Sequence, residues 1–263
     1  VVQLIRDPYA DYARRVLGLE ALRRVGEPVD ARERGTAVHA AIENYERNGG
    51  SLEDLIVEEL VAAGATEELI ALERTLWLRA ADFYLDWSAT RAPSRINSVL
   101  EETAKLTFAS AAGETTLRAT ADRVEQLTDG TLAIIDFKTG RPKTAAQVQT
   151  GLEPQLSLEG AIAQESGFGA IKAAPVSQII YFQFSTSKAV LNDDNGQPLV
   201  FEDARTSEIV DESLKGLKRL IAGYAKPDTP YRSKPRAEFA WDYGDYDRLA
   251  RRKEWTIEDG GEE

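Results

Sequence analysis

The stretch RATADRVEQLTDGTLAIIDFKTG, residues 118–140, decides the fold of this chain. Its second half is rich in β-branched and apolar residues, and Asp129-Gly130 is a hairpin signal that requires positive φ. The stretch therefore predicts two β-strands joined by a tight turn. Because side chains alternate across a strand, Asp136 and Lys138 are expected to lie side by side on one face of a sheet.

The register of this hairpin decides whether Asp122 joins them. A two-residue loop would place Asp122 opposite Phe137, on the other face. A three-residue loop over residues 128–130, ending in a left-handed Gly130, would place Asp122 opposite Asp136. We predict the three-residue loop, which brings two carboxylates and a lysine together.

Asp122, Asp136 and Lys138 have the chemistry of a metal-dependent hydrolase site. Adjacent carboxylates repel unless a cation lies between them, and hard oxygen ligands suit Mg²⁺ or Mn²⁺. Such a metal polarises a phosphoryl oxygen and lowers the pKa of a bound water, which Lys138 is placed to hold. The alternative is a solvated strand with an Asp–Lys surface pair, which D-x-K alone would favour. The hairpin context favours phosphodiester hydrolysis.

Asp122 and the run D-F-K-T-G at residues 136–140 resemble the PD-(D/E)xK nuclease signature in its RecB-like form. The flanks are similar to the nuclease domain of the AddB subunit of AddAB helicase–nucleases, in a cysteine-free form. The flanking segments are RDPYADYARRVLGL (6–19), RGTAVHAAIE (34–43), PQLSLEGAIA (154–163) and PYRSKPRAEFAWDYGDYDRLARRKEW (230–255). The resemblance implies an α/β, restriction-endonuclease-like fold, with a mixed β-sheet flanked by helices.

The resemblance also implies a metal site. In RecB-like nucleases a histidine in a G-x-x-x-H context completes the site, and Gly35 and His39 match that spacing. Taken alone, one histidine on an alanine-rich helix is more often structural. The implied metal is Mg²⁺, for which Mn²⁺ substitutes. Its implied ligands are His39, Asp122, Asp136 and the carbonyl of Phe137.

The family also has a glutamine that helps to position the nucleophile or the DNA, usually within Q-x-x-x-Y. Gln155, in a helix expected over residues 151–164, fits this position. The implied catalytic set is Asp122, Asp136, Lys138 and Gln155. Glu159 stands where the tyrosine would fall, so the role of that tyrosine is left empty.

Three other acidic residues, Glu43, Glu101 and Glu102, are further candidates for a place beside the metal site. Glu43 lies four residues after His39 on the same helical face and is a weaker candidate for orienting its ring. Glu101 and Glu102 precede the hairpin in the preceding strand, and one of them could face the site. We expect both to be exposed to solvent.

Hydrophobic periodicity predicts the remaining elements. Helices are expected over residues 1–19 in two pieces, 33–47, 51–90 as two helices, 207–225 and 246–253. Strands are expected over residues 99–108, 176–184 and 199–201.

The composition is that of an ordinary globular protein. Of the 263 residues, 43% are hydrophobic and 29% are charged. The sequence has no apolar run of about 18 residues and no charged-then-apolar leader. We predict one nuclease domain over residues 1–255, an acidic disordered tail over residues 256–263, and a cytoplasmic location without membrane contact.

Zero cysteines exclude disulfides, thiolate zinc sites, cysteine nucleophiles and iron–sulfur clusters. Many RecB-like relatives carry a four-cysteine iron–sulfur cluster with one ligand near an x-P-Y motif, where this chain has Asp7 before Pro8-Tyr9. We therefore expect packing and ion pairs to hold the two ends together. Methionine is also absent and the sequence begins at Val1, which indicates a domain excised from a longer protein.

The formal net charge of −12 is the main observation against a nucleic-acid partner, because phosphate attraction supplies most non-specific affinity. A metal site nevertheless needs local acid, and a larger basic assembly can hold such a domain on DNA. The resemblance implies a Mg²⁺-dependent deoxyribonuclease of exonuclease type. It would cleave single-stranded DNA from a helicase during recombinational repair of double-strand breaks, with an AddA-type subunit as partner.

Two alternatives remain at this stage. One is another RecB-like exonuclease, such as a CRISPR-adaptation nuclease, against which the long C-terminal segment and the missing cysteines count. The other is an inactive interaction module that has kept the fold. The four residues Asp122, Asp136, Lys138 and His39 argue against that module, since an inactive site has no physical reason to keep such costly charges together.

Overall fold

The computed structural model describes residues 1–20, 31–140, 144–184, 199–202, 204–236 and 244–255. Its strands form one five-stranded sheet in the order β1-β2-β3-β4-β5. Only β3 and β4 pair in parallel, so the sheet is mixed, as predicted. The strands are β1 (Arg95–Ser110), β2 (Gly113–Leu127), β3 (Leu132–Lys138), β4 (Val176–Gln183) and β5 (Leu199–Glu202). The predicted acidic tail lies outside the described residues.

The helices follow the predicted order, with three differences. Residues 246–251, where a helix over residues 246–253 was expected, form turns, and the helix α10 covers only Arg252–Trp255. A short helix α6 precedes α7, and it begins with a capping box between Thr144 and Gln147. The helix α7 begins at Gln155 and not at Gly151, because Gly151 takes a φ of 72° and turns the chain. The helices are α1 (Val2–Arg6), α2 (Pro8–Arg15), α3 (Ala31–Asn48), α4 (Leu52–Ala62), α5 (Glu67–Arg91), η1 (Ala92–Ser94), α6 (Ala145–Gln149), α7 (Gln155–Glu165), α9 (Ala204–Tyr224) and α10 (Arg252–Trp255).

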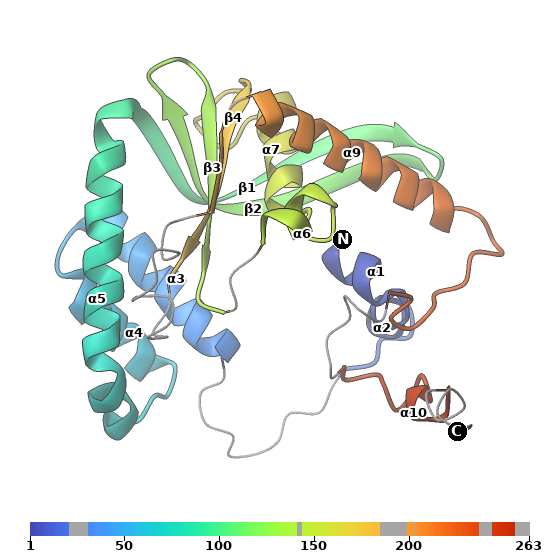
Figure 1. The fold of residues 1–263 in the computed structure, drawn as a ribbon, viewed down its shortest axis with the longest axis horizontal. Helices are drawn as coiled ribbons and strands as arrows, with labels where there is room; N and C mark the ends of the chain where they lie inside the picture. The colour runs from blue at the N-terminus through green and yellow to red at the C-terminus, as the bar shows by residue number, and fades with distance from the viewer. Residues whose placement is uncertain (21–30, 141–143, 185–198, 203, 237–243, 256–263) are drawn as a thin grey trace, which may run out of the picture.

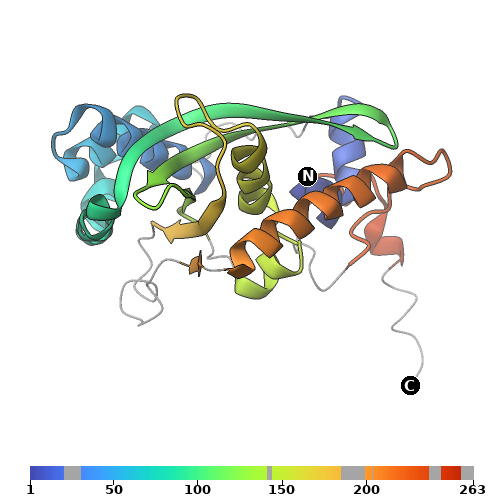
Figure 2. The ribbon, with the colours of Figure 1, turned by 90° about the horizontal axis from the view of Figure 1, so that it is seen from above.

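Helices cover both faces of the sheet, and the alternation of β3 divides its side chains between two cores. Ile135 and Phe137 pack with α3, α4 and α5 on one face. Leu132 and Ile134 pack with α6, α7 and α9 on the other. Figure 1 shows α3–α5 to the left of β3 and β4, and α6, α7 and α9 to their right. In Figure 2 the long β1–β2 hairpin arches above α7 and α9, and α3–α5 lie at its left end. No described helix is both long and apolar enough to cross a bilayer.

The hairpin between β2 and β3 has the predicted register. The amide of Leu127 donates to the carbonyl of Thr131 at 2.9 Å, which closes a three-residue loop, and Gly130 takes a φ of 85°. The last paired residues before the site are Arg123 and Ile135. One further step along the two strands places Asp122 opposite Asp136, on the face that α7 covers.

An ion network is buried on the opposite face of β2. Arg123 is fully buried, and its Nη1 atom donates to Tyr84 Oη at 2.9 Å and to Glu46 Oε1 at 3.0 Å. Its Nη2 atom lies 2.8 Å from Glu125 Oε1, and Arg91 also pairs with Glu125. Since α3 carries Glu46 and α5 carries Tyr84, the network ties both helices to the strand that carries Asp122.

Hydrogen bonds and ring packing join the two ends of the chain. Asp7 accepts from the amides of Ala10 at 3.2 Å and Lys234 at 3.4 Å. The rings of Tyr12 and Tyr231 lie 5.1 Å apart. Asp7 thus caps α2 and holds the C-terminal segment. The prediction that packing joins the ends is confirmed.

Candidate active site

The hairpin places the two predicted aspartates at the end of the β2–β3 pairing. Where the ladder ends, Asp122 Oδ2 accepts a hydrogen bond of 2.7 Å from the amide of Phe137. Asp136 is almost fully buried, whereas the side chain of Asp122 is 12% exposed. The side chain of Asp122 therefore stands in for a missing backbone partner and is fixed against β3.

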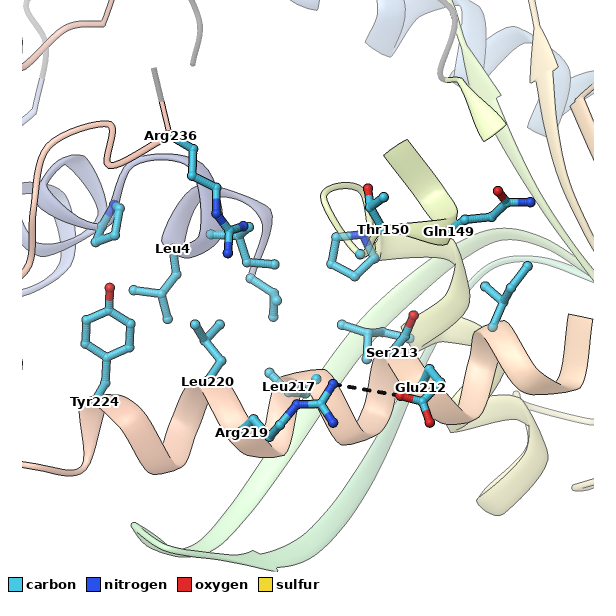
Figure 3. Close-up of a pocket in the computed structure, with 18 of the residues that line it drawn as sticks. Leu4, Gln149, Thr150, Glu212, Ser213, Leu217, Arg219, Leu220, Tyr224 and Arg236 are labelled. Atoms are coloured by element: carbon cyan, nitrogen blue, oxygen red, sulfur yellow. Dashed lines mark ion pairs between the residues drawn. The ribbon is translucent and has the colours of Figure 1, made fainter. Parts of the chain in front are cut away.

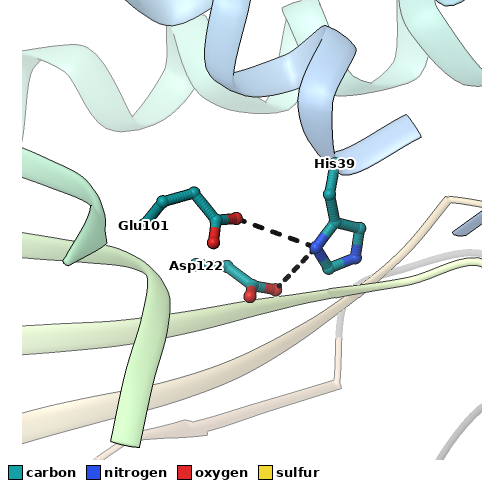
Figure 4. Close-up of side chains that lie close together, drawn as sticks. All are labelled: His39, Glu101 and Asp122. Atoms are coloured by element: carbon teal, nitrogen blue, oxygen red, sulfur yellow. Dashed lines mark ion pairs between the residues drawn. The ribbon is translucent and has the colours of Figure 1, made fainter. Parts of the chain in front are cut away.

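His39, Glu101 and Asp122 converge beside this position (Figure 4). His39 Nδ1 lies 3.6 Å from Asp122 Oδ2 and 3.9 Å from Glu101 Oε1. One ligand atom from each residue lies within 4.8 Å of the other two. The helix α3 and the strands β1 and β2 each supply one member. The expectation that Glu101 is solvent-exposed is wrong, because its side chain is only 31% exposed and faces the site.

The backbone of Phe137 fixes the ring of His39. His39 Nε2 lies 2.8 Å from the carbonyl oxygen of Phe137, and a carbonyl can only accept, so Nε2 carries the proton. The lone pair is then on Nδ1, which faces the two carboxylates. Metal-binding histidines commonly donate their other ring nitrogen to such a carbonyl. Glu43, the candidate for this orienting role, pairs instead with Arg47 at 2.8 Å.

The spacing of these three side chains suits one divalent cation. Ligand atoms that share a Mg²⁺ ion at about 2.1 Å are separated by about 3.0 Å when adjacent and about 4.2 Å when opposite. The distances from His39 Nδ1 to the two carboxylates fall between these limits. Carboxylate oxygens with one imidazole nitrogen are ligands that Mg²⁺ and Mn²⁺ accept.

Glu101 holds its position at a cost in backbone strain and charge. Its φ is 50°, in the left-handed region that side-chain-bearing residues rarely adopt. Burial and the negative charge of Asp122 raise the pKa of the Glu101 carboxyl to about 6, although His39 opposes the shift. The sequence left open which of Glu101 and Glu102 could face the site, and both were expected to be exposed. The observed pairing of Leu100 with Arg123 places it opposite Asp122.

Asp136 forms a second group with Lys138 and Gln155. Lys138 Nζ lies 2.7 Å from Asp136 Oδ1 and 2.6 Å from Oδ2, and Gln155 Nε2 donates to Oδ1 at 3.0 Å. Burial raises the pKa of Asp136 to about 6, although the charge of Lys138 opposes it. Burial lowers the pKa of Lys138, but the contact with Asp136 and the charges of Asp122 and Glu159 together raise it above its usual value, so the amine stays protonated.

Two hollows differ in their chemistry. The smaller, about 410 Å³, opens beside the site and is lined by Arg32, Gly35, Thr36, His39, Ala40, Glu43, Glu101 and Thr139. The larger, about 570 Å³, lies among α1, α9 and the loop before α7 (Figure 3). Leu4, Leu217 and Leu220 contribute to its apolar lining, and none of the predicted site residues borders it. Of the two hollows, the smaller one therefore borders the candidate active site, because His39 and Glu101 line it.

Comparisons with known proteins identify the family of this chain. Residues 3–239 match the family model of the PD-(D/E)XK nuclease superfamily. An uncharacterized protein of Rickettsia felis is 24% identical over 181 residues, covering 63% of this chain and 21% of that protein. One of Rickettsia bellii is 25% identical over 177 residues with the same coverage. The chain spans about a fifth of the length of these relatives.

Among solved structures, protein VC1899 from Vibrio cholerae is 14% identical, and the match covers 84% of this chain and 57% of that chain. Its TM-score is 0.26, which is too low to carry an argument.

Proposed function

Because the chain belongs to the PD-(D/E)XK nuclease superfamily, we propose that it is a Mg²⁺-dependent deoxyribonuclease that hydrolyses phosphodiester bonds of single-stranded DNA. The observation that carries the proposal is the convergence of His39, Glu101 and Asp122 next to the Asp136–Lys138 pair. A donor set of carboxylates and imidazole beside a fixed cation suits phosphoryl transfer and few other reactions.

In this proposal, four side chains would hold the divalent ion, His39 through Nδ1 and Glu101, Asp122 and Asp136 through carboxylate oxygens. Glu101 replaces the Phe137 carbonyl of the predicted ligand set, because that carbonyl accepts a hydrogen bond from His39. When bound, the ion would polarise a phosphoryl oxygen and lower the pKa of a coordinated water. The carbonyl of Phe137 holds the His39 ring and so keeps Nδ1 directed at the carboxylates. The hollow beside His39 and Glu101 gives the DNA access to the site.

Lys138 acts as a cation in this proposal. Its amine is protonated and held within 2.7 Å of Asp136, so it can offset charge on the phosphate or hold the attacking water by donating a hydrogen bond. Gln155 fixes one oxygen of Asp136. Neither residue needs to move a proton before attack.

We further propose that the substrate strand comes from a helicase during end processing of double-strand breaks, with an AddA-type subunit as partner. The resemblance of the flanks to the AddB nuclease domain supports this context. The relatives are about five times longer than the matched region, which leaves room for other domains. The net charge of −12 also favours a larger assembly that supplies the DNA grip.

Cleavage of end-labelled single-stranded DNA with Mg²⁺ tests the proposal. The variants are Asp136→Ala and Lys138→Ala, and the matched control is Lys105→Ala, which changes an exposed lysine on β1. We expect the parent and the control to cut and both site variants to lose at least about 100-fold while remaining folded. If the parent alone is inert, the assay is repeated with its helicase partner. Cleavage there that survives Asp136→Ala would assign the cutting to the partner.

A further inference from the structure

The helix α7 contributes a second residue beside Gln155 that the mechanism has not used. Glu159 lies one helical turn after Gln155 and is only 2% exposed. Fully buried carboxylates are rare unless they are paired. Gln155, in contrast, is exposed at the edge of the site. A buried acid therefore lies beneath a surface amide.

Glu159 and Asp136 share the amide nitrogen of Gln155. Gln155 Nε2 donates to Asp136 Oδ1 at 3.0 Å and to Glu159 Oε1 at 3.2 Å. An amide NH₂ group has two hydrogens, so both are used. Flipping the amide would turn its carbonyl oxygen toward the Asp136 carboxylate, which pairs with Lys138 and cannot donate a hydrogen bond to it. The chemistry thus fixes the orientation, with nitrogen inward and the carbonyl oxygen Oε1 on the exposed side.

The other oxygen of Glu159, Oε2, is buried and has no hydrogen-bond partner among the described residues. Burial and the negative charges of Asp136 and Asp122 raise the pKa of Glu159 well above its usual range. A lone buried acid of this kind costs stability. The one hydrogen bond described for Glu159 comes from Gln155, which also donates to Asp136. The role of Glu159 therefore lies in its contact with Gln155.

We propose that Glu159 is a positioning residue that locks the Gln155 amide, so that Gln155 holds Asp136 and presents its carbonyl oxygen to the attacking water or the DNA. The inference rests on the proposed function. Removing Glu159 leaves one amide hydrogen without its acceptor, and rotation about the side chain then misdirects Oε1. Small misplacements of positioning groups cost up to about 100-fold in rate.

A double-mutant cycle tests the inference. The single changes are Gln155→Ala, Glu159→Leu and Glu159→Gln, and the double variant is Gln155→Ala/Glu159→Leu. Glu159→Gln keeps a carbonyl oxygen that accepts the same hydrogen bond, so it should stay within about threefold of the parent. Glu159→Leu should lower kcat about tenfold without changing the Mg²⁺ concentration for half-maximal rate. The double variant should lose no more than Gln155→Ala alone.

The matched control is Glu153→Gln, which changes another buried acid close to α7 that pairs with Arg6 at 2.5 Å. It should leave kcat unchanged. Losses that multiply in the double variant would overturn the inference, because Glu159 would then act independently of Gln155. A raised Mg²⁺ requirement in Glu159→Gln would overturn it too, and would make Glu159 a metal ligand.

A spectroscopic measurement separates this inference from the proposed function. The side-chain amide of Gln155 gives two proton resonances in a ¹⁵N–¹H spectrum of the metal-free protein. We expect slow hydrogen exchange at both in the parent and in Glu159→Gln, and fast exchange at one in Glu159→Leu. Equal exchange in all three proteins contradicts the positioning role even where cleavage is observed. If the exchange pattern is as expected but the protein cuts no DNA, the contact between Gln155 and Glu159 is confirmed and only the nuclease assignment is refuted.

Discussion

His39 Nε2 lies 2.8 Å from the carbonyl oxygen of Phe137, although 98 residues separate the two in the chain. Gly35 makes this approach of α3 to β3 possible. A Cβ atom at Gly35 would lie 3.0 Å from Thr139 Oγ1, closer than ordinary packing allows. A side chain at the glycine of the G-x-x-x-H motif would therefore require Thr139 or α3 to shift.

Gly35→Ala should weaken Mg²⁺ binding and cleavage about tenfold, because the added methyl group displaces α3 and His39 from the carboxylates. The free energy of unfolding should not fall along with Mg²⁺ binding, since alanine stabilises a helix relative to glycine by about 1 kcal/mol. Calorimetric titration and chemical denaturation measure the two quantities. Thr139→Ala removes the atom that the new methyl group meets, so it should restore binding in the Gly35→Ala background. Failure of this rescue would remove the steric explanation.

Glu101→Gln should raise the Mg²⁺ concentration for half-maximal cleavage about tenfold, as loss of a ligand or its close partner does. Glu102→Gln is the matched control, because the Glu102 side chain lies against Gly169 and not against His39. Metal-dependent cleavage rates of both variants are the measurement. Equal effects would mean that Glu101 contributes only general negative charge.

Asp136→Asn should abolish cleavage and yet stabilise the metal-free protein by about 1–2 kcal/mol at pH 7.5, because a buried carboxylate with a raised pKa is costly when ionised. Denaturant unfolding in EDTA measures the gain. Asp129→Asn, in the exposed β2–β3 loop, is the control and should give no gain. A destabilised Asp136→Asn protein would show that the Lys138 pair outweighs burial.

The stability gained from Mg²⁺ should depend on pH between about 4 and 7. Asp136 and Glu101 have folded pKa values of about 6, above their ordinary values, so the folded protein retains protons that the unfolded chain has released. Without metal, their contribution to stability is complete below about pH 4 and is lost as the pH rises through 6. Mg²⁺ competes with these protons, so its stabilisation should be small at pH 5 and full above pH 7.

Thermal unfolding at each pH, with and without Mg²⁺, measures this dependence. The double variant Glu101→Gln/Asp136→Asn lacks both titrating groups and should show no metal effect at any pH. A metal effect that is constant from pH 5 to pH 8 would contradict the assignment of these two groups to the ion.

Arg123→Met should destabilise the protein by about 3–5 kcal/mol, because it leaves Glu46 without its ion-pair partner and removes the fully buried one of the three arginines that pair with Glu125. Arg74→Met breaks an exposed pair with Glu53, 3.0 Å long, and should cost less than about 1 kcal/mol. Urea denaturation compares the two variants. Similar costs would mean that Arg91 and Arg95 compensate for the lost guanidinium.

The hairpin register was predictable because it is local. Asp129-Gly130 fixes the turn, and the alternation of β3 then brings Asp122 opposite Asp136. The position of His39 followed from resemblance, since no local rule places a helix against a strand 98 residues away. Thr144 and Gln147 form a capping-box pattern in the sequence, from which the start of the helix α6 was predictable although no helix was expected there.

Glu101 and Glu159 were not predictable from local patterns. Two adjacent glutamates in a strand point to opposite faces, and the choice between them depends on where the β1–β2 loop falls. The left-handed backbone at Glu101 is imposed by tertiary contacts. Glu159 lies in a helix in which every residue from Leu156 to Ala163 is buried, so the helix has no polar face to signal that one acid points inward.

The order of the strands also bears on how the chain folds. β1, β2 and β3 follow one another as hairpins, and such local pairing forms early. The strand β3 can pair in parallel with β4 only after the crossover segment that contains α6 and α7 has formed. We therefore expect the acidic half of the site to assemble before the helix α7 that brings Gln155, and a nascent chain that ends before α7 would hold its carboxylates together with no amide beside them.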